Sequence, residues 1–315
     1  MNIIRKIKTK AWALIIKSFR KSRIYPFLYR ASWHLLFHKE QKKDIVHNYL
    51  AARPNSFAGI GHQMANWIAG YWFAQKFNLN FAHMPFASDR WEKLLGFGIN
   101  ELSVEDLSKK GFKTVRLPRF DEDNEKEIRW IRRIISSYKS KVIFICEQDQ
   151  FYREQFGVMD VLKRKFYNTK TKESHNLIYN DSTFNIAVHI RRGDIVVNKK
   201  PNNINLSNRF QDISYFINTL KLAIAKLNKT KRISIFLFSQ GVKSDFSAFE
   251  EFENVSYCLD MGAEESFLHM VYADVLITSK SSFSYKPALL SNGLKFVPDG
   301  FWHGYPETPD WVVIK

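Results

Sequence analysis

The second half of the chain alternates apolar runs with amphipathic segments at a spacing that few folds accommodate. Five apolar runs are typical of buried strands: Phe184–His189, Ile233–Phe238, Val255–Leu259, Val275–Thr278 and Leu294–Pro298. The segments between them carry apolar residues at helical spacing. Because strands that alternate with helices form parallel sheets, we predict a Rossmann-like α/β domain over residues 183–315.

The first half predicts a second α/β domain over residues 48–182, whose strands are less distinct. A chain of 315 residues exceeds the size that one hydrophobic core usually serves, so two domains are expected. Helical patterns run from His62 to about Lys76 and from Asp121 to Tyr138, and Val142–Cys146 is typical of a strand. The polar segment Thr169–Thr183 is interpreted as the linker between the two domains.

Residues 1–47 form a basic leader that carries much of the chain's net charge of +17. On a helical wheel its apolar residues gather on one side, away from the lysines: Ile4, Ile7, Ala11, Leu14 and Ile15. This pattern predicts a helix that lies on an anionic membrane surface, with packing on the protein's own body as the alternative. The uncharged run Ala11–Ile16 is too short to span a bilayer. The rest of the chain is only mildly basic, so we expect no nucleic-acid partner.

The most informative motif follows the first of the five strands. His189, Arg191, Arg192 and Asp194 crowd the point where that strand ends. Ligands of open α/β sheets bind outside the carboxyl ends of the strands, and adjacent arginines there favour an anion such as a phosphate. The alternative is that one arginine pairs with Asp194 and the other with a neighbouring domain.

Two further segments have the composition of anion sites. Thr278–Ser284 places hydroxyl side chains and Lys280 at the start of a helix, where backbone N–H groups attract anions, although ordinary N-capping explains serines equally well. Gly59-Ile60-Gly61-His62-Gln63 opens a long helix with glycines that permit close approach of a ligand. It is too short for a dinucleotide fingerprint, and the chain contains no P-loop.

These three motifs, in this order, resemble those of the α-1,2-fucosyltransferases and of the wider superfamily that includes α-1,6- and protein O-fucosyltransferases. The resemblance runs from about Ser56 to Leu294. It implies a GT-B fold, with two Rossmann-like domains facing across a cleft. It also implies an inverting, metal-independent transfer from GDP-fucose, held mainly by the C-terminal domain, with no cofactor.

The resemblance also implies roles for individual residues. Arg191 matches the arginine that clamps the β-phosphate, and His189 and Asp260 match positions that help to read the guanine. Ser281, Ser282 and Phe283 match the loop that closes on the phosphates and the nucleobase. The other expected substrate contacts are Gly61, His62, Gln63, Arg192, Ser239 and Lys280. Asp194 either orients an arginine or acts as the base, and His62 is a second candidate for the base.

The chain departs from the usual motifs at several points. His62 stands where the family usually has Asn, and Gln240-Gly241 follows Ser239 where acidic residues are common. A different nucleotide-sugar donor is therefore an alternative. The run Asp121-Glu122-Asp123 matches the DxD pattern of metal-dependent glycosyltransferases, but an acidic helix start is the favoured interpretation.

Together these features predict a bacterial fucosyltransferase that modifies a glycan hydroxyl during synthesis of surface polysaccharide or lipopolysaccharide. The basic leader predicts a peripheral protein at the cytoplasmic face of the inner membrane, beside a lipid-linked acceptor. Cys146 and Cys258 lie in apolar runs and are expected to be reduced, which is consistent with that compartment. The alternative from another class is a non-catalytic basic adaptor that binds membrane or nucleic acid.

Overall fold

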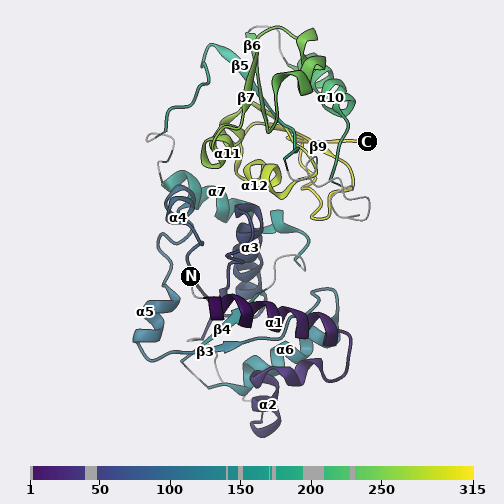
Figure 1. Ribbon diagram of the computed structural model, residues 1–315. Helices are drawn as coiled ribbons and strands as arrows, with labels where there is room; N and C mark the ends of the chain where they lie inside the picture. The colour runs from purple at the N-terminus through teal and green to yellow at the C-terminus, as the bar shows by residue number, and fades with distance from the viewer. Residues whose placement is uncertain are drawn as a thin grey trace. The chain divides into compact units, whose positions relative to one another are not determined.

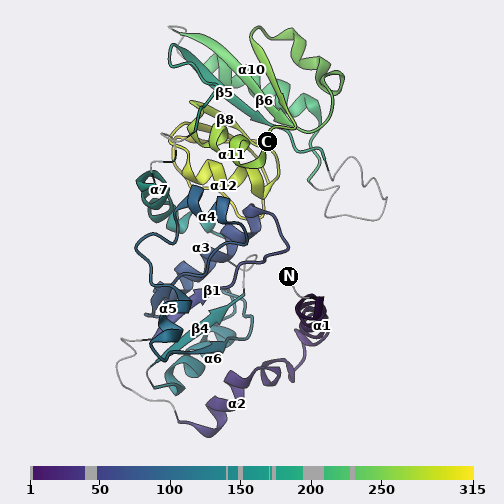
Figure 2. The same ribbon diagram turned by 60° about the vertical axis from the view of Figure 1, so that its left-hand side comes forward.

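Two parallel sheets, one in each of two units of the chain, organise the structure (Figures 1 and 2). The computed structural model describes residues 3–39, 48–139, 141–147, 152–169, 171, 175–193, 209–227 and 231–315. Unit 1 comprises Met1–Arg53, Ala69–Met84 and Asn100–Phe151. Unit 2 comprises Pro54–Ile68, Pro85–Ile99 and Tyr152–Lys315. The two α/β domains expected from the sequence are thus present, each built around its own sheet.

The boundary expected at residues 182 and 183 does not coincide with the division between the units. Segments 54–68, 85–99 and 152–182 belong with the C-terminal sheet, because they pack against its helices. Among them, the helices α4 (Asp89–Leu95) and α7 (Met159–Asn168) contact each other, and α7 contacts a helix of the C-terminal sheet.

The sheet of unit 1 has four parallel strands in the order β2-β1-β4-β3. They are β1 (Tyr49–Ala52), β2 (Asn80–Ala82), β3 (Lys113–Arg116) and β4 (Val142–Cys146). Every residue of β4 is buried, as its continuous apolar sequence predicts for a central parallel strand. The helices of this unit are α5 (Val104–Lys109), α6 and the leader helices, together with the second part of α3 (Ile60–Lys76).

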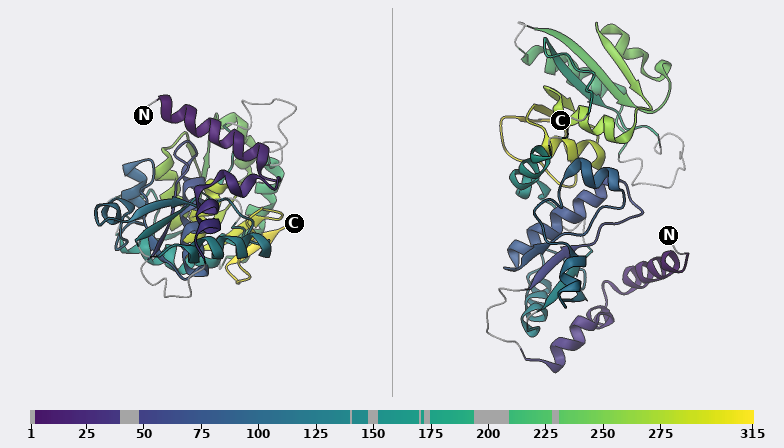
Figure 3. Two further views of the ribbon diagram at one scale, coloured as in Figure 1. Left: turned by 90° about the horizontal axis from the view of Figure 1, so that it is seen from below. Right: turned by 90° about the vertical axis from the view of Figure 1, so that its left-hand side faces the viewer.

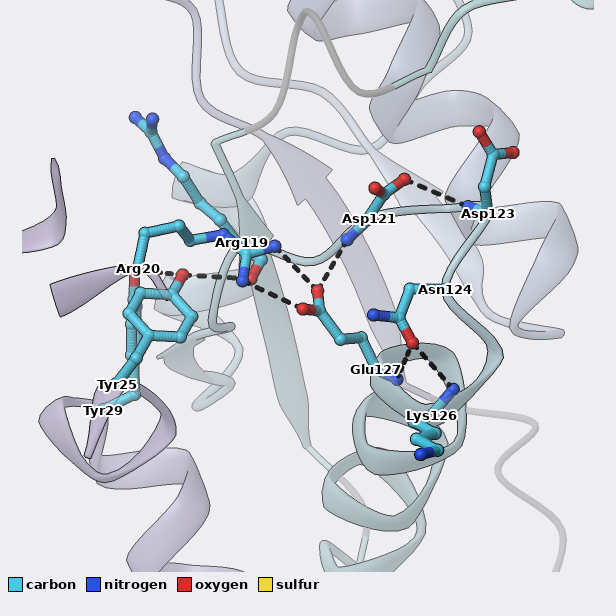
Figure 4. A network of polar contacts seen from close by, with 9 residues as sticks. All are labelled: Arg20, Tyr25, Tyr29, Arg119, Asp121, Asp123, Asn124, Lys126 and Glu127. Atoms are coloured by element: carbon cyan, nitrogen blue, oxygen red, sulfur yellow. Dashed lines mark hydrogen bonds and ion pairs between the residues drawn. The ribbon is translucent and has the colours of Figure 1, made fainter. Parts of the chain in front are cut away.

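Helix α6 (Glu125–Ser137) shows how local sequence sets a boundary (Figure 4). It begins at Glu125, later than expected, because the Asn124 side chain accepts the N–H groups of Lys126 and Glu127 and so caps the first turn. Its core side is the expected one: Ile128, Ile131, Ile134 and Ile135 are all buried. The run Asp121–Asp123 forms the acidic lead-in to this helix.

The leader consists of α1 (Ile3–Phe19), the short η1 (Tyr25–Leu28) and α2 (Arg30–Phe37), which Figure 3 shows as separate helices joined in sequence. Arg20 fixes the end of α1 to α6 through a bidentate ion pair with Glu127, with N–O distances of 3.0 and 2.7 Å (Figure 4). A small cluster of Ile16, Tyr25 and Tyr29 is buried beside it.

Much of the apolar surface of α1 is exposed. Five apolar side chains form an exposed stripe, each between 39% and 66% exposed: Ile4, Ile7, Leu14, Ile15 and Phe19. Four of them belong to the apolar side predicted from the sequence, and Phe19 extends it. Part of the leader therefore packs on the protein, as one alternative predicted, and the membrane-surface helix stays a prediction. None of the helices in the described ranges is both long and apolar enough to cross a membrane.

The sheet of unit 2 has six parallel strands in the order β10-β9-β8-β5-β6-β7. Five match the predicted runs: β5 (Thr183–His189), β6 (Arg232–Ser239), β7 (Val255–Leu259), β8 (Val275–Ile277) and β9 (Leu294–Pro298). The sixth, β10 (Trp311–Ile314), was not predicted from the sequence. The chain therefore steps outward in one direction from β5 to β7 and in the other from β8 to β10.

Helices cover both faces of this sheet. The residues of α10 (Ile213–Lys226) and of the 3₁₀ segment η4 (Lys243–Glu251) share one apolar core with the even-numbered residues Ile186 and Val188 of β5. The helices α11 (Ala263–Tyr272) and α12 (Ser282–Leu290) belong to the other face. Because side chains alternate along a strand, His189 points to the α12 side.

Candidate anion site

The site forms where the strand order of the larger sheet reverses. Strands β5 and β8 are direct neighbours, with Ile186 opposite Val275 and Val188 opposite Ile277. From this pair the chain continues to β6 on one side and to β9 on the other. Parallel sheets bind ligands outside the carboxyl ends of the strands at such a reversal. The first two predicted motifs follow these two strands, so the topology brings them together.

Ser279 joins the two strand ends through three hydrogen bonds. Its hydroxyl donates to the His189 carbonyl oxygen at 2.9 Å and accepts the Arg191 N–H at 3.2 Å. The Nδ1 atom of His189 lies 2.8 Å from the same hydroxyl. Since a hydroxyl has one proton and Ser279 uses it on the carbonyl, we infer that His189 Nδ1 carries a proton and that Nε2 is an acceptor.

His189 is buried and neutral. Burial is the main cause that lowers its pKa to about 3, and the neighbouring Arg191 guanidinium lowers the pKa further in the same direction. The ring is tilted against Phe283, with the centroids 5.6 Å apart. His189 therefore presents an uncharged imidazole at the site over the physiological pH range.

Arg191 points to the beginning of α12. Its Nη1 donates to the Ser281 hydroxyl oxygen at 3.2 Å, and Ser281 is the N-cap whose hydroxyl accepts the Phe283 N–H. The N-terminus of a helix carries partial positive charge. The helix dipole and the full charge of Arg191 therefore act at the same place, where a negatively charged ligand is stabilised.

Arg192 is held differently. Its Nη1 donates to the Arg191 carbonyl oxygen at 3.0 Å and its Nη2 donates to the Gln211 carbonyl oxygen at 3.2 Å. The guanidinium lies over the Phe210 ring, 4.7 Å from its centroid. Burial is the largest cause of a lowered Arg192 pKa. Asp194, which was expected to orient one of the arginines or to act as a base, lies outside the described residues.

The glycine motif lies against the serine turn. A Cβ atom on Gly61 would come within 2.8 Å of the Ser282 Cβ and 2.9 Å of the Ser282 carbonyl atoms, so only glycine fits without a shift of that backbone. The first turn of α3 therefore meets the first turn of α12. The sequence had placed this motif in the other domain, but residues 54–68 belong to unit 2.

The two residues after Gly61 differ in their surroundings. Gln63 is buried, and its amide donates to the Ala58 carbonyl oxygen at 3.0 Å and accepts the Ala87 N–H at 2.8 Å. Gln63 therefore shapes the glycine loop in the structure, which is a different role from the expected substrate contact. His62 is half-buried at the start of α3.

Ser239 and Asp260 follow the next strands of the sheet. Ser239 Oγ donates to the Ile190 carbonyl oxygen at 2.8 Å, which joins the ends of β6 and β5. Asp260 is exposed, adopts a left-handed φ of 58°, and donates its N–H to the Ser239 carbonyl oxygen at 3.0 Å. Both residues thus stand at carboxyl strand ends, in the order that the sequence predicted.

One polar residue that the sequence analysis missed contacts both halves of the site. The Gln211 side-chain oxygen accepts the Lys280 N–H at 2.7 Å, and the Gln211 carbonyl accepts Arg192. Lys280 itself is half-buried, and its amine lies 3.7 Å from the position of a Cβ on Gly300. The only local signal was the Asp212 cap of α10, which predicts a helix start but not this contact.

A buried polar cluster lies behind the serine turn. Lys286 of α12 is fully buried and donates to Gln155. His303 is also buried, and burial is the main cause that lowers its pKa to about 2, with Lys286 and His62 contributing. The Tyr285 ring stacks near His303, with the centroids 5.6 Å apart. The aromatic C-terminal segment therefore contributes to the core, except for Trp302, which is 39% exposed.

Two cavities lie away from these residues. One of about 740 Å³ is lined by Phe184 and Leu294, at the opposite ends of their strands from the site. The other, of about 730 Å³, lies in unit 1 between Arg20 and Trp130. In the described ranges, no three His, Cys, Asp or Glu side chains are grouped so that they could hold a metal ion.

Comparison with known proteins gives a family match. A search of curated proteins found no match. Among solved structures, the chain is similar to fucosyltransferase NodZ from Bradyrhizobium (11% identity, 78% of this chain and 94% of that chain covered, TM-score 0.46). It is also similar to a variant of Arabidopsis thaliana FUT1 in complex with GDP (10% identity, 92% of this chain and 78% of that chain covered, TM-score 0.46). A third similar structure is POFUT1 in complex with GDP (12% identity, 86% of this chain and 99% of that chain covered, TM-score 0.48).

The family model for glycosyl transferase family 11 matches residues 29–296. The match covers most of the chain and all three motifs, and it confirms the resemblance that those motifs indicated. The chain belongs to glycosyl transferase family 11 and is a glycosyltransferase.

Proposed function

We propose that the protein transfers fucose from GDP-fucose to a glycan hydroxyl, with inversion and without a metal ion. The observation that carries the proposal is the position of Arg191, whose guanidinium donates to the N-cap Ser281 at the positive end of α12. This arrangement suits a diphosphate better than a neutral ligand, because the guanidinium and the positive end of the helix dipole both attract negative charge. The site's place at the strand-order reversal supports the same ligand class.

The chemistry follows from where charge develops. As the bond between the sugar and the diphosphate breaks, the sugar gains oxocarbenium character and the diphosphate gains negative charge. Arg191 and the N–H groups at the start of α12 are fixed by Ser279 and Ser281 before the reaction begins. Donors preorganised in this way stabilise a transition state more than a ground state, and removing one typically costs about 100-fold or more in rate.

The acceptor hydroxyl must lose a proton during the transfer. We retain Asp194 and His62 as the candidates for this base, since both belong to motifs that flank the expected position of the phosphates.

Recognition of the guanine of the donor is the second specific element of the proposal. Neutral His189 offers an acceptor at Nε2, and Asp260 offers a carboxylate at a strand end, which suits the N–H donors of guanine.

The test is a nucleotide panel with the full-length protein. Thermal shift and calorimetry with GDP, UDP and ADP are followed by incubation with candidate nucleotide sugars, with release of free nucleoside diphosphate as the readout. We expect GDP alone to stabilise the protein and GDP-fucose to be the preferred donor. Stabilisation by UDP in place of GDP overturns the choice of donor, and absence of any nucleotide binding overturns the proposal.

We further propose that the protein docks on an anionic membrane through α1 and meets a lipid-linked glycan acceptor there, at the cytoplasmic face of a bacterial inner membrane. The exposed apolar stripe of α1 is the supporting observation, because a soluble helix normally buries that side. Exposed lysines lie on the same helix and its end: Lys8, Lys10, Lys17 and Lys21. Apolar insertion and attraction to anionic lipid then act together.

Vesicle flotation tests the docking proposal. We expect the protein to float with vesicles containing phosphatidylglycerol and not with pure phosphatidylcholine vesicles. The double variant Ile7→Asp, Leu14→Asp should remain in the soluble fraction, whereas Leu222→Asp, an exposed leucine on α10, should float like the wild type. Equal flotation of the stripe variant overturns the role of α1.

A further inference from the structure

The segment Arg209-Phe210-Gln211, just before α10, contacts both the residues after β5 and the turn after β8. The Phe210 ring lies under the Arg192 guanidinium, and the Arg209 guanidinium lies over the Trp302 ring at 5.1 Å from its centroid. Gln211 accepts hydrogen bonds from both Arg192 and Lys280. Neither the sequence motifs nor the family match assigns a role to this segment.

Gln211 is the centre of these contacts because it uses two different oxygens. Its main-chain carbonyl accepts Arg192 Nη2 at 3.2 Å, which fixes the loop after β5. Its side-chain carbonyl accepts the Lys280 N–H at 2.7 Å, which fixes the turn after β8. One residue therefore ties together the two strand ends whose cations and N–H groups form the anion site.

The Gln211 side chain is uncharged, and this property matters for the site as much as its hydrogen bond to Lys280 does. A carboxylate in its place would accept the same main-chain N–H but would add a negative charge at the turn after β8. An alanine would leave the Lys280 N–H without its side-chain acceptor. The amide satisfies the turn without adding a charge that would repel an anionic ligand.

We propose that Gln211 is a positioning residue for the diphosphate: it sets the spacing between the Arg192 loop and the Lys280 turn. This inference rests on the proposed function. Since Gln211 acts on the phosphate end of the donor, its loss should weaken binding of a nucleoside diphosphate more than binding of the monophosphate. A residue that merely supported the fold would weaken both alike.

The experiment compares GDP and GMP affinities of the wild type, Gln211→Ala and Gln211→Glu by calorimetry. One lost hydrogen bond predicts that Gln211→Ala weakens GDP binding about tenfold, with a smaller effect on GMP. The added charge predicts that Gln211→Glu weakens GDP binding by roughly a further tenfold or more. Gln75→Ala, an exposed glutamine on α3, is the matched control and should leave both affinities unchanged.

The outcomes separate this inference from the proposed function. A wild type that binds no nucleoside diphosphate overturns both. A wild type that prefers GDP to GMP, with the same preference retained in both Gln211 variants, overturns the positioning role alone. Steady-state kinetics provides the second readout, since the donor KM should rise in Gln211→Ala more than kcat falls. Equal loss in kcat at unchanged KM also contradicts the inference.

Discussion

Arg191 Nη1 donates to Ser281 Oγ at 3.2 Å, and the same oxygen accepts the Phe283 N–H, so one hydroxyl links the cation to the start of α12. Ser281 is fully buried. The guanidinium is therefore oriented by a side chain that cannot move without uncapping the helix. The hydrogen bond to Ser281 therefore sets where the positive charge of Arg191 points, and the hydrogen bond of the Arg191 N–H to Ser279 fixes its backbone.

Arg191→Ala should reduce transfer about 100-fold or more, because the departing diphosphate loses its main fixed charge. Arg191→Lys should recover a small part of that loss, since an ammonium restores charge without the planar fork. Turnover with saturating donor is the measurement. Arg232→Ala, an exposed arginine at the opposite end of the same sheet, is the control. Near-normal turnover of Arg191→Ala would contradict the proposed role.

Gly61→Ala should lower both stability and transfer, because its Cβ would fall within 3.0 Å of the Ser282 backbone. Relieving such a contact typically costs about 1–3 kcal/mol and here shifts the serine turn itself. Gly59→Ala is a matched control, since nothing lies within 4 Å of its Cβ position. Denaturant unfolding and donor KM are the measurements. If the two variants behave alike, close packing of α3 on α12 is wrong.

The larger sheet could be predicted from the sequence because its signal is local. A buried parallel strand is mostly apolar, and β5 to β9 each contain an apolar run with few polar interruptions. β10 is apolar as well, but it is a strand of only 4 residues at the edge of the sheet, after an aromatic segment, and it was not identified as a strand. The strand order was not accessible either, because pairing of β5 with β8 depends on packing across the whole domain.

The candidate site shows the same division. Residues next to strand ends, such as Arg191 and Ser281, could be identified because their type is unusual there. The contact of Gly61 with Ser282 and the bonds of Gln211 could not, since they join segments far apart in sequence. A glutamine before a helix is common in sequences, and its contacts with the ends of β5 and β8 depend on how the domain folds.

Acid should destabilise the protein from about pH 6.5 down to about pH 3 through its buried histidines. Burial lowers the pKa of His303 to about 2 and that of His189 to about 3, both well below the unfolded value of about 6.5. The unfolded chain therefore binds more protons in this window, so stability is full above it and falls as pH drops.

His303→Gln should reduce the dependence of the unfolding free energy on pH. The loss of one titrating group corresponds to roughly 1.4 kcal/mol for each pH unit well below 6.5. Gln75→Ala, at an exposed position without a titrating side chain, should leave the slope unchanged. The measurement is the unfolding free energy in denaturant at several pH values. The slopes are compared, so that a difference in stability between wild type and variant cancels. Parallel curves for wild type and His303→Gln would show that His303 is not held neutral by burial.

The ion pair of Arg20 with Glu127 should hold the leader on unit 1. It is bidentate, at 3.0 and 2.7 Å, and Glu127 also accepts the Asp121 N–H at 2.8 Å (Figure 4). The side chains are only 22% and 30% exposed, so we expect a coupling free energy of about 1 kcal/mol in a double-mutant cycle with alanine. The cycle removes the separate loss of the Asp121 contact.

The exposed pair of Lys109 and Glu105 is the control for that cycle. Its N–O distance of 2.8 Å is close to that of the leader pair, but its side chains are 68% and 78% exposed, so its coupling should be weaker. Limited proteolysis adds a local readout, because Arg20→Ala should speed cleavage within α1 without speeding cleavage of the sheet of unit 2. Equal coupling in the two cycles would mean that solvent screens the leader pair as fully as the surface pair. The packing of α1 would then rest on the buried cluster around Ile16, Tyr25 and Tyr29.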